Sequence, residues 1–356
     1  MSKGYNGLRA IASINRRQFI KYGGLALGTN ILGACASNSK KVSSRNSKGD
    51  LERVTLGIGW YAEAEYGGFY QALATGIYED YGLDVILRAD GAQTNSTLLL
   101  MGGAFDFALG GSIASIKAVE EGIPKIAIAA IFQKDPRVLI AHPDMGNDSL
   151  EQLKGKPIMV SPQVGLSYWP FLESQYGFTS DQRRPYNFDV RPFMIDRKAI
   201  QQGYLTSEPF AIEKQGGFKP VVMLLADYGY KPYSNIIETT IEMVEKKPDL
   251  VERFVEASIK GWYSYLAEPE AGNAAIQKEN PDMTEEQMAY TAAKIKEYDI
   301  IISEDTKKLG IGAMTDKRWE TFYREMVEFG VFQENTNYKE AYTLQFVNKG
   351  ADYYQS

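Results

Sequence analysis

The feature that most constrains the fold is a repeated alternation of short apolar strands with helices about ten residues long. The first strand is expected at 54–59, and residues 68–78 follow it with Tyr70, Leu73 and Ile77 at helical spacing. Such alternation predicts an α/β fold with a largely parallel sheet. Further strands are expected at 83–87, 105–109, 125–132, 138–141, 157–160, 189–191 and 221–225, and further helices at 94–101, at 112–121 and around Trp169.

The pattern changes to helix after residue 240. Apolar residues recur on one face at 248–266, 284–298 and 315–329. Helical spacing of apolar side chains is the ordinary signature of a helix packed on a core. We therefore expect these three helices to complete the core and not to hold a cofactor.

The chain is long enough for two lobes. Removal of the leader described below leaves 322 residues (356 − 34), which is more than one hydrophobic core usually covers. His142–Pro143 marks the expected crossing into a second lobe, and 235–240 is expected to return to the first. We therefore expect lobe 1 at 53–141 plus 235–352 and lobe 2 at 142–234.

The first 35 residues look like a bacterial export signal. Arg16 and Arg17 resemble the pair of a twin-arginine signal, which can also pass through the general export route. The uncharged stretch 22–34 is shorter than the ~20 apolar residues that span a bilayer. It ends in Leu-Gly-Ala before Cys35, which looks like a lipobox. We expect an exported lipoprotein; the alternative is a membrane-anchoring or interfacial N-terminal helix.

This interpretation divides the N-terminal region into two parts. Residues 1–34 are the expected signal peptide, and 35–52 the expected lipidated cysteine followed by a polar, flexible tether. The leader holds five basic residues and no acid, so its removal takes the net charge from −6 to −11. A nucleic-acid-binding domain normally has a basic footprint. We therefore expect no nucleic-acid partner.

Cysteine and histidine are too scarce for several kinds of site. Cys35 is the only cysteine, so no disulfide can form within one molecule. His142 is the only histidine, which excludes a Cys/His zinc site, and a Ser-His-Asp triad would have to use it. Beside Pro143, His142 is expected to be a solvated loop residue. We expect no metal, no cofactor and no catalytic residues.

Five segments carry a resemblance to a known family. They are 67–85, 102–108, 153–158, 203–209 and the start of a helix near 247–249. They resemble the substrate-binding proteins of ABC importers, in the group of thiamine-pyrimidine, riboflavin, alkanesulfonate, taurine and nitrate binders. The likeness covers about residues 54–330.

The resemblance implies a periplasmic-binding-protein fold, with two α/β lobes that carry mixed sheets, a hinge, and a ligand cleft between them. The expected partners are a small-molecule ligand, an ABC permease with its ATPase, and the membrane through lipidated Cys35. The protein is expected to be a monomer in the periplasm or at the cell surface. Related pyrimidine-synthesis enzymes rely on histidine, iron and a cysteine-rich motif, which disfavours an enzyme here. A ligand-sensing domain stays open as a third class.

Candidate ligand contacts follow from the rule that ligands bind outside the carboxyl ends of the strands in open α/β sheets. Trp60 and Tyr61 follow the first strand, where the resemblance implies a stacking ring; packing at the rim is the alternative. Ser112 lies at a helix N-terminus, which can hold an anionic or polar group or simply cap the helix. Gln133 follows the fourth long strand.

The second lobe offers a further set. The candidates are Gly165, Ser167, Trp169, Glu208, Asp227, Tyr228 and Tyr233. Gly165 and Ser167 open a helix, and Trp169 is expected as the opposing ring. Glu208 precedes a proline and matches the acid that the family places in its cleft. It could alternatively be a surface charge in the first turn of a helix.

Aromatic rings with a carboxylate favour one ligand class. Rings favour a flat, unsaturated ligand, and a carboxylate favours amino or ring N–H donors. We expect an aminopyrimidine-type thiamine precursor, with riboflavin or another flat heterocycle as the nearest alternative. A sulfonate, taurine or nitrate would favour an arginine fork, and Lys134 and Arg137 near the expected hinge keep that alternative open.

Overall fold

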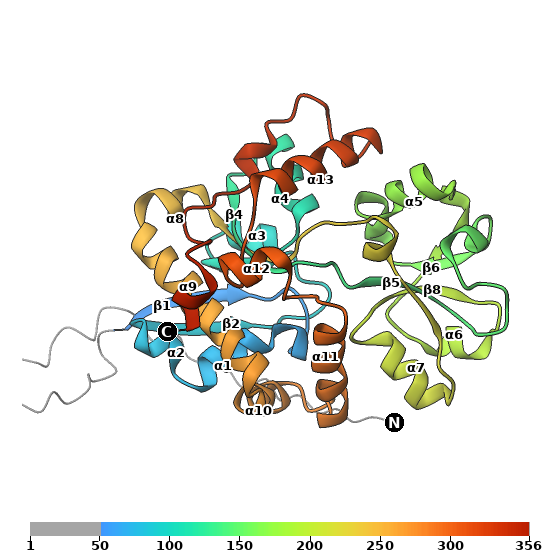
Figure 1. Ribbon diagram of the computed structural model, residues 1–356, viewed down its shortest axis with the longest axis horizontal. Helices are drawn as coiled ribbons and strands as arrows, with labels where there is room; N and C mark the ends of the chain where they lie inside the picture. The colour runs from blue at the N-terminus through green and yellow to red at the C-terminus, as the bar shows by residue number, and fades with distance from the viewer. Residues whose placement is uncertain (1–50, 356) are drawn as a thin grey trace, which may run out of the picture. The chain divides into compact units, whose positions relative to one another are not determined.

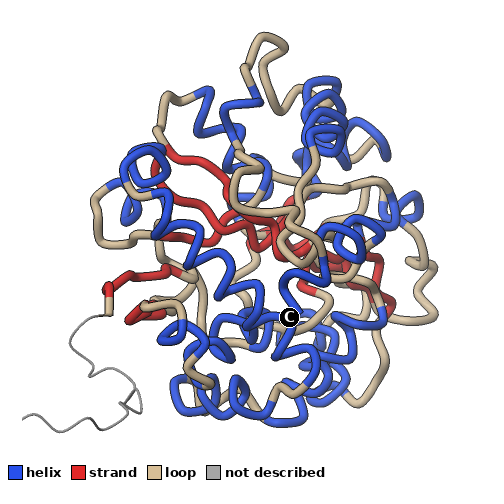
Figure 2. The backbone as a smooth tube through the Cα atoms, turned by 60° about the vertical axis from the view of Figure 1, so that its left-hand side comes forward, coloured by secondary structure: helices blue, strands red, loops and turns tan. Residues whose placement is uncertain are grey.

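The computed structural model describes residues 51–355. The predictions for Arg16, Arg17, Cys35 and most of the tether lie outside these residues. Two five-stranded mixed sheets organise the described part, in the orders β2-β1-β3-β10-β4 and β7-β6-β8-β5-β9 (Figure 1). Helices and loops surround the strands (Figure 2). Within 51–355, none of the helices combines the length and the apolar character that crossing a membrane requires.

The first sheet combines parallel and antiparallel pairs. β1 pairs with β2 and β3 in parallel, and β10 pairs antiparallel with β3 and β4. Its strands are β1 Glu52–Gly57, β2 Leu83–Arg88, β3 Phe107–Gly110, β4 Lys125–Phe132 and β10 Ser234–Thr240. The helices between them are α1 Gly67–Ala74, α2 Ile77–Asp80, α3 Ser96–Met101 and α4 Ser112–Glu120.

The C-terminal part is helical, as the apolar periodicity predicted. The three expected helices are confirmed as α9, α11 and α13, and shorter helices join them. The bounds are α8 Ile241–Lys246, α9 Pro248–Ala267, α10 Glu270–Glu279, α11 Glu285–Glu297, α12 Glu304–Leu309, α13 Asp316–Glu328 and α14 Ala351–Gln355. Trp262 of α9 and Trp319 of α13 are fully buried.

Helix α9 packs very closely on α1. A Cβ atom at Gly261 would lie 2.4 Å from the carbonyl oxygen of Gly68 and 2.6 Å from Cβ of Ala72. Only a residue without a side chain fits such an approach. The contact fixes the helix that directly follows the loop carrying Trp60, and so it supports one wall of the site described below.

The second sheet is also mixed. β5 pairs antiparallel with β8 and β9, while β6 pairs parallel with β7 and β8. Its strands are β5 Arg137–Ala141, β6 Ile158–Val160, β7 Arg183–Pro185, β8 Ile200–Tyr204 and β9 Val221–Leu224. Its helices are α5 Trp169–Tyr176, α6 Arg191–Ile195 and α7 Glu208–Gly216, all on the right of Figure 1 with β5, β6 and β8.

Two sequence-based expectations about this sheet are wrong. Residues 137–141 belong to the second sheet, so the chain crosses at 133–136 and not at His142–Pro143. The return crossing is 229–233; we call these two stretches the crossing segments. Residues 189–191 are not a strand: Asp189 accepts a hydrogen bond from the Arg191 backbone N–H (3.0 Å), and Pro192 lies in the first turn of α6.

His142 is buried, contrary to the expected solvated loop. Its Nε2 donates to the carbonyl oxygen of Phe193 at 2.7 Å. Its ring stacks on Phe193 and Phe218, with centroids 4.3 and 4.7 Å away. The two aromatic partners come from distant parts of the second lobe, so the local sequence around His142 could not indicate them.

A buried ion pair supports the first sheet. Lys125 of β4 lies 2.7 Å from Glu238 of β10, and their side chains are 2% and 3% exposed. Ser115 of α4 donates a further hydrogen bond of 2.6 Å to Glu238, and Lys125 contacts Thr97 at 3.3 Å. The pair therefore links two neighbouring strands to two helices.

Replacement of Lys125 by methionine is expected to destabilise the protein by about 3–5 kcal/mol, because it leaves Glu238 buried without its cation. Urea unfolding measures the free energy of unfolding. Lys246→Met is the matched control. The side chains of Lys246 and its partner Glu242 are each 71% exposed, and exposed ion pairs contribute little to stability. Equal stability of Lys125→Met and the control would contradict this role.

Candidate functional site

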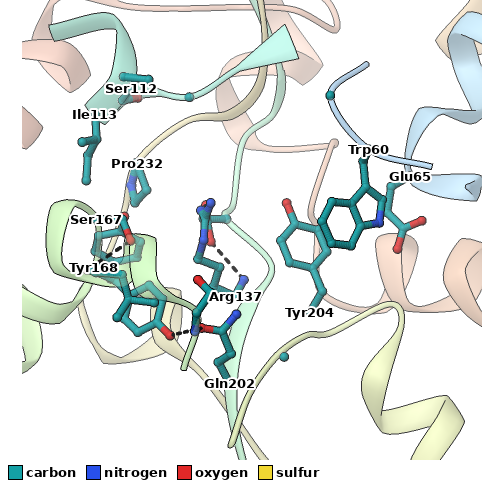
Figure 3. A pocket seen from close by; sticks show the side chains of 18 of the residues that line it. Trp60, Glu65, Ser112, Ile113, Arg137, Ser167, Tyr168, Gln202, Tyr204 and Pro232 are labelled. Atoms are coloured by element: carbon teal, nitrogen blue, oxygen red, sulfur yellow. Dashed lines mark hydrogen bonds and ion pairs between the residues drawn. The ribbon is translucent and has the colours of Figure 1, made fainter. Parts of the chain in front are cut away.

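A cavity of about 700 Å³ is enclosed by elements of both sheets. We call it the inner cavity. Its lining comes from the loop after β1, the start of α4, both crossing segments, and the β8–α7 connection. In Figure 3, Trp60 and Glu65 lie on one side, and Tyr168 and Gln202 on the other. The volume lies within the range of about 300–1,000 Å³ that is usual for small-molecule sites.

Three glutamates form an acidic cluster in this cavity: Glu63, Glu65 and Glu208. Burial raises the pKa of Glu63 well above its ordinary value, and the charges of Glu65 and Glu208 raise it further. A hydrogen bond from Trp60 partly offsets this rise. Burial also raises the pKa values of Glu65 and Glu208. Buried like charges oppose full ionisation, so the cluster gains from donors that a ligand can bring.

Glu65 is held by groups from other parts of the chain. Its side chain accepts a hydrogen bond from the hydroxyl of Thr206, and its backbone carbonyl accepts one from the Asn235 amide at 2.9 Å. The backbone carbonyl of Thr206 accepts a hydrogen bond from Thr291 of α11 at 3.0 Å. The second carboxylate oxygen of Glu65, Oε2, is buried and has no partner among residues 51–355.

Glu208 begins α7 and faces the cavity. It accepts a hydrogen bond from the Tyr186 hydroxyl at 3.1 Å and one from the Tyr204 backbone N–H at 2.8 Å. A Cβ atom at Gly203 would lie 2.5 Å from Cδ1 of Ile140 and 3.1 Å from Cβ of Glu208, so the end of β8 packs closely on the start of α7. The carboxylate is thereby fixed beside the other two glutamates.

Arg137 is a cation in the lining of the same cavity, apart from the acidic cluster. It binds the buried carboxylate of Asp135, which also accepts from the Arg137 backbone N–H at 2.9 Å. Burial lowers the pKa of Arg137, but the charge of Asp135 outweighs it, so the net pKa is raised. Because Asp135 balances its charge, Arg137 is a weak site for a further anion.

Hydroxyl and amide groups surround this ion pair. Burial raises the pKa values of Tyr168, Tyr204 and Tyr230, so their hydroxyls stay protonated at neutral pH. Gln202 accepts from the Ser161 backbone N–H at 2.7 Å and from the Tyr168 hydroxyl at 3.1 Å through one oxygen. Its NH₂ group is then the part of the amide that can donate to a ligand.

The comparisons with known proteins agree with this architecture. The family model described as NMT1/THI5 like matches residues 63–272. The chain belongs to the NMT1/THI5-like family. The matched residues include the acidic cluster and both crossing segments.

Proteins similar in sequence and structural neighbours carry different functional names. The riboflavin-binding protein RibY of Chloroflexus aurantiacus is 23% identical over 325 residues, covering 86% of this chain and 89% of its own. A Legionella pneumophila protein named 4-amino-5-hydroxymethyl-2-methylpyrimidine phosphate synthase is 22% identical over 308 residues, covering 83% and 92%. The periplasmic aliphatic sulphonate-binding protein SsuA of Escherichia coli superposes with a TM-score of 0.58 at 15% identity, covering 82% of this chain and 91% of SsuA. The fold is therefore that of periplasmic binding proteins, as the sequence predicted.

Five of the ligand contacts expected from the sequence line the inner cavity: Trp60, Ser112, Ser167, Glu208 and Tyr233. Ser112 does not cap its helix in the usual way. Its hydroxyl accepts from the Tyr233 backbone N–H at 3.0 Å, so it joins the start of α4 to the return crossing segment. The following residues, Ile113 and Ala114, also face the cavity.

Six expected contacts do not line the inner cavity: Tyr61, Gln133, Gly165, Trp169, Asp227 and Tyr228. Trp169 is 1% exposed and donates to Glu173 at 3.0 Å, so it is core and not the opposing ring. The Gln133 amide donates to two backbone carbonyls. Asp227 pairs with Lys134 at 3.0 Å outside the cavity, which takes that lysine away from the site as well.

The reasons for the remaining three differences are local. Tyr61 is exposed, and its ring lies edge-on to Trp60. Tyr228 bonds through its carbonyl oxygen to Tyr176 and packs against that ring. Gly165 lies against Arg183, whose Nη1 would be 2.8 Å from an added Cβ.

Sequence reasoning missed Glu63, Glu65, Asp135, Tyr168 and Gln202. A signal for the first two existed, since two glutamates two residues apart follow Trp60 in the loop after the first strand. Tyr168 and Gln202 carried no such signal. Tyr168 directly precedes the buried Trp169, and only the turn of the chain there decides which ring faces the cavity.

The acidic cluster predicts a pH dependence of stability. The unfolded chain ionises at the ordinary glutamate pKa, about 4.3, while burial and neighbouring charges keep Glu63 protonated to higher pH when folded. The folded state then binds more protons, so the free energy of unfolding falls as pH rises above about 4.3, until the folded pKa is passed. Glu63→Gln removes one such group and is expected to weaken this fall.

Thermal melts of the ligand-free protein between about pH 4 and about pH 7 measure the effect. Glu268→Gln, at an exposed glutamate outside the cavity, is the matched control and is expected to follow the unmodified protein. A Glu63→Gln curve parallel to that of the control would contradict the protonation of Glu63 in the fold.

Proposed function

We propose that this protein is an exported solute-binding protein of an ABC import system, and that it captures a flat nitrogen heterocycle bearing N–H donors. The first candidate ligand is an aminopyrimidine-type thiamine precursor. One observation carries the proposal: the acidic cluster meets aromatic side chains in a cavity between two sheets. The names of its relatives, which include a riboflavin binder and a pyrimidine phosphate synthase, support the ligand class.

The chemistry of the cavity supports a donor-rich ring. A ligand amino group can offer hydrogens to carboxylates that otherwise repel one another, and a hydrogen bond to a charged group contributes about 1.5–3 kcal/mol. Trp60, Tyr66 and Tyr204 line the same part of the cavity as Glu65 and provide apolar faces for the ring. Glu65 Oε2 is a buried acceptor that a nearby N–H would satisfy.

A strongly anionic ligand fits less well. Arg137 is already paired with Asp135, and the acidic cluster offers a sulfonate or nitrate no positive charge. Lys117, the other cation of the lining, pairs with Glu120 at 2.6 Å. The structural likeness to a sulphonate-binding protein concerns the fold, because identity is only 15%.

Riboflavin is a second candidate, favoured by the size of the cavity. The volume of about 700 Å³ leaves room beyond a single pyrimidine ring. A fused three-ring system would extend along the aromatic wall while its ring N–H reaches the acidic cluster. Both candidates share the flat, N–H-bearing ring that the proposal requires.

An enzymatic role is the other class to weigh, because one relative is named a synthase. The related pyrimidine-synthesis enzymes use a histidine, and His142 of this chain is stacked between Phe193 and Phe218 in the second lobe, outside the cavity. Capture without chemistry is therefore the function that we propose.

The cellular setting is part of the proposal. Cleavage before Cys35 and lipidation there would anchor the protein, and Arg16-Arg17 would direct its export. The lobes would move about the crossing segments and present the bound ligand to a permease. Residues 53–132 with 234–352 would form lobe 1, and 137–228 would form lobe 2.

A thermal-shift screen followed by calorimetry tests the ligand class. The panel holds 4-amino-5-hydroxymethyl-2-methylpyrimidine, thiamine, riboflavin, taurine, an alkanesulfonate and nitrate; bound ligand raises the melting temperature. Glu208→Gln is expected to weaken binding of the amino-bearing ligand by about 1.5–3 kcal/mol, roughly ten- to a hundredfold in Kd. Glu268→Gln, outside the cavity, should leave it unchanged.

Two results would contradict this proposal. Shifts with sulfonates or nitrate alone would mean that the cation, and not the acidic cluster, selects the ligand. Unchanged affinity in Glu208→Gln would remove Glu208 from the binding site.

A further inference from the structure

A second hollow adjoins the inner cavity. This outer pocket has a volume of about 630 Å³ and is the more open of the two. The two share part of their lining, namely Trp60, Glu63, Phe188, Ser207 and Glu208. Because five residues face both spaces, a single ligand can extend from one into the other.

Two aromatic rings stand at the junction. Trp60 and Phe188 meet edge-to-face, with centroids 5.0 Å apart and planes at 71°. Trp60 follows β1 of the first sheet, and Phe188 follows β7 of the second. Tyr61 packs on Trp60 at 5.6 Å and Tyr186 on Phe188 at 5.4 Å, so each ring is supported from its own side.

Phe188 adopts a backbone conformation that is unfavourable for a bulky residue. Its φ is +64°, and its side chain is 45% exposed. A left-handed conformation is unfavourable for a residue with a bulky side chain, and local strain of this kind concentrates at ligand clamps. This conformation places the Phe188 ring at the junction of the two spaces. The ring stays partly exposed, so its burial contributes little to the stability of the fold.

Outside the shared residues, the lining of the outer pocket mixes polar side chains with the apolar Val190 and Ala211. Asn187 and Gln215, together with the shared Ser207, offer neutral donors and acceptors. Arg191 is bound by Asp189 through three contacts of 2.6–2.9 Å, so the one cation of this lining is neutralised. Hydroxyl groups suit such a lining, because they both donate and accept.

We propose that the outer pocket is a second subsite, which takes the uncharged, hydroxylated arm of a flat heterocycle whose ring lies in the inner cavity. The arm leaves the cavity between Trp60 and Phe188. This inference rests on the proposed function and favours its second candidate, a flat heterocycle that carries a polyhydroxyl arm. A phosphorylated arm is disfavoured, because Glu63, Glu208 and Asp189 all line its path.

Fluorescence titration of the full-length protein with three flavins tests the subsite. Riboflavin carries ring and hydroxylated arm, lumiflavin carries the ring alone, and FMN adds a phosphate to the arm. We expect riboflavin to bind about tenfold tighter than lumiflavin, as two or three neutral hydrogen bonds allow. FMN should bind more weakly than riboflavin.

Variants locate the arm. Gln215→Leu and Asn187→Ala should each weaken riboflavin binding several-fold while lumiflavin affinity stays constant, and that constancy also shows that each variant is folded. Gln175→Leu is the matched control, since Gln175 is exposed on α5 and lines neither space. It should change neither affinity.

Three outcomes would overturn the subsite. They are equal binding of riboflavin and lumiflavin, equal losses for both flavins in Gln215→Leu, and FMN binding at least as tight as riboflavin. If lumiflavin, riboflavin and the aminopyrimidine all fail to bind, the proposed function fails together with the subsite. Binding of lumiflavin or the aminopyrimidine without any effect of the arm leaves the proposed function standing and removes only the subsite.

Discussion

A buried hydrogen bond between two side chains holds the site together. The Thr206 hydroxyl, in the connection after β8, donates to Glu65, in the loop after β1. Both residues are almost fully buried, and Thr291 of α11 completes the link by bonding to the Thr206 carbonyl. Through this contact the two sheets and a C-terminal helix place one carboxylate at the cavity wall. Glu65 and Glu208 then lie close enough to Glu63 for their charges to raise its pKa.

This arrangement gives the cavity two chemically different sides. The acidic cluster accepts hydrogen bonds and gains from donors, while the Asp135–Arg137 pair with its tyrosines is balanced in charge. A ligand with donors at one end and a neutral remainder satisfies both sides at once. An unbalanced anion satisfies neither, since the cations of the lining already have carboxylate partners.

The secondary structure could be predicted from the sequence, because the spacing of apolar residues in a helix or strand depends only on neighbouring residues. The alternation of strands and helices, and the apolar stripes of α9, α11 and α13, predicted elements close to the observed ones. Sheet membership of 137–141 did not follow, because an apolar strand pairs equally well in either sheet and its partners are at least 59 residues away. The burial of His142 has the same cause.

A site residue could be predicted only where its type and its place after a strand were enough to identify it. Trp60, Ser112 and Glu208 line the cavity on that rule. Glu65 depends on Thr206, which is 141 residues away, and Tyr168 depends on the turn before α5. Trp169 shows the converse, since an aromatic residue at a plausible position was taken up by the core of its own lobe.

The position of Thr206 also bears on time scales. Thr206 follows β8 of the second sheet, and its hydroxyl bonds to Glu65, which follows β1 of the first sheet. Thr291 of α11 bonds to the carbonyl of Thr206 as well. Under the proposed movement of the lobes about the crossing segments, opening of the cavity would break the bond from Thr206 to Glu65. The residence time of a bound molecule would then depend on the lifetime of that bond, which hydrogen exchange around Thr206 would measure.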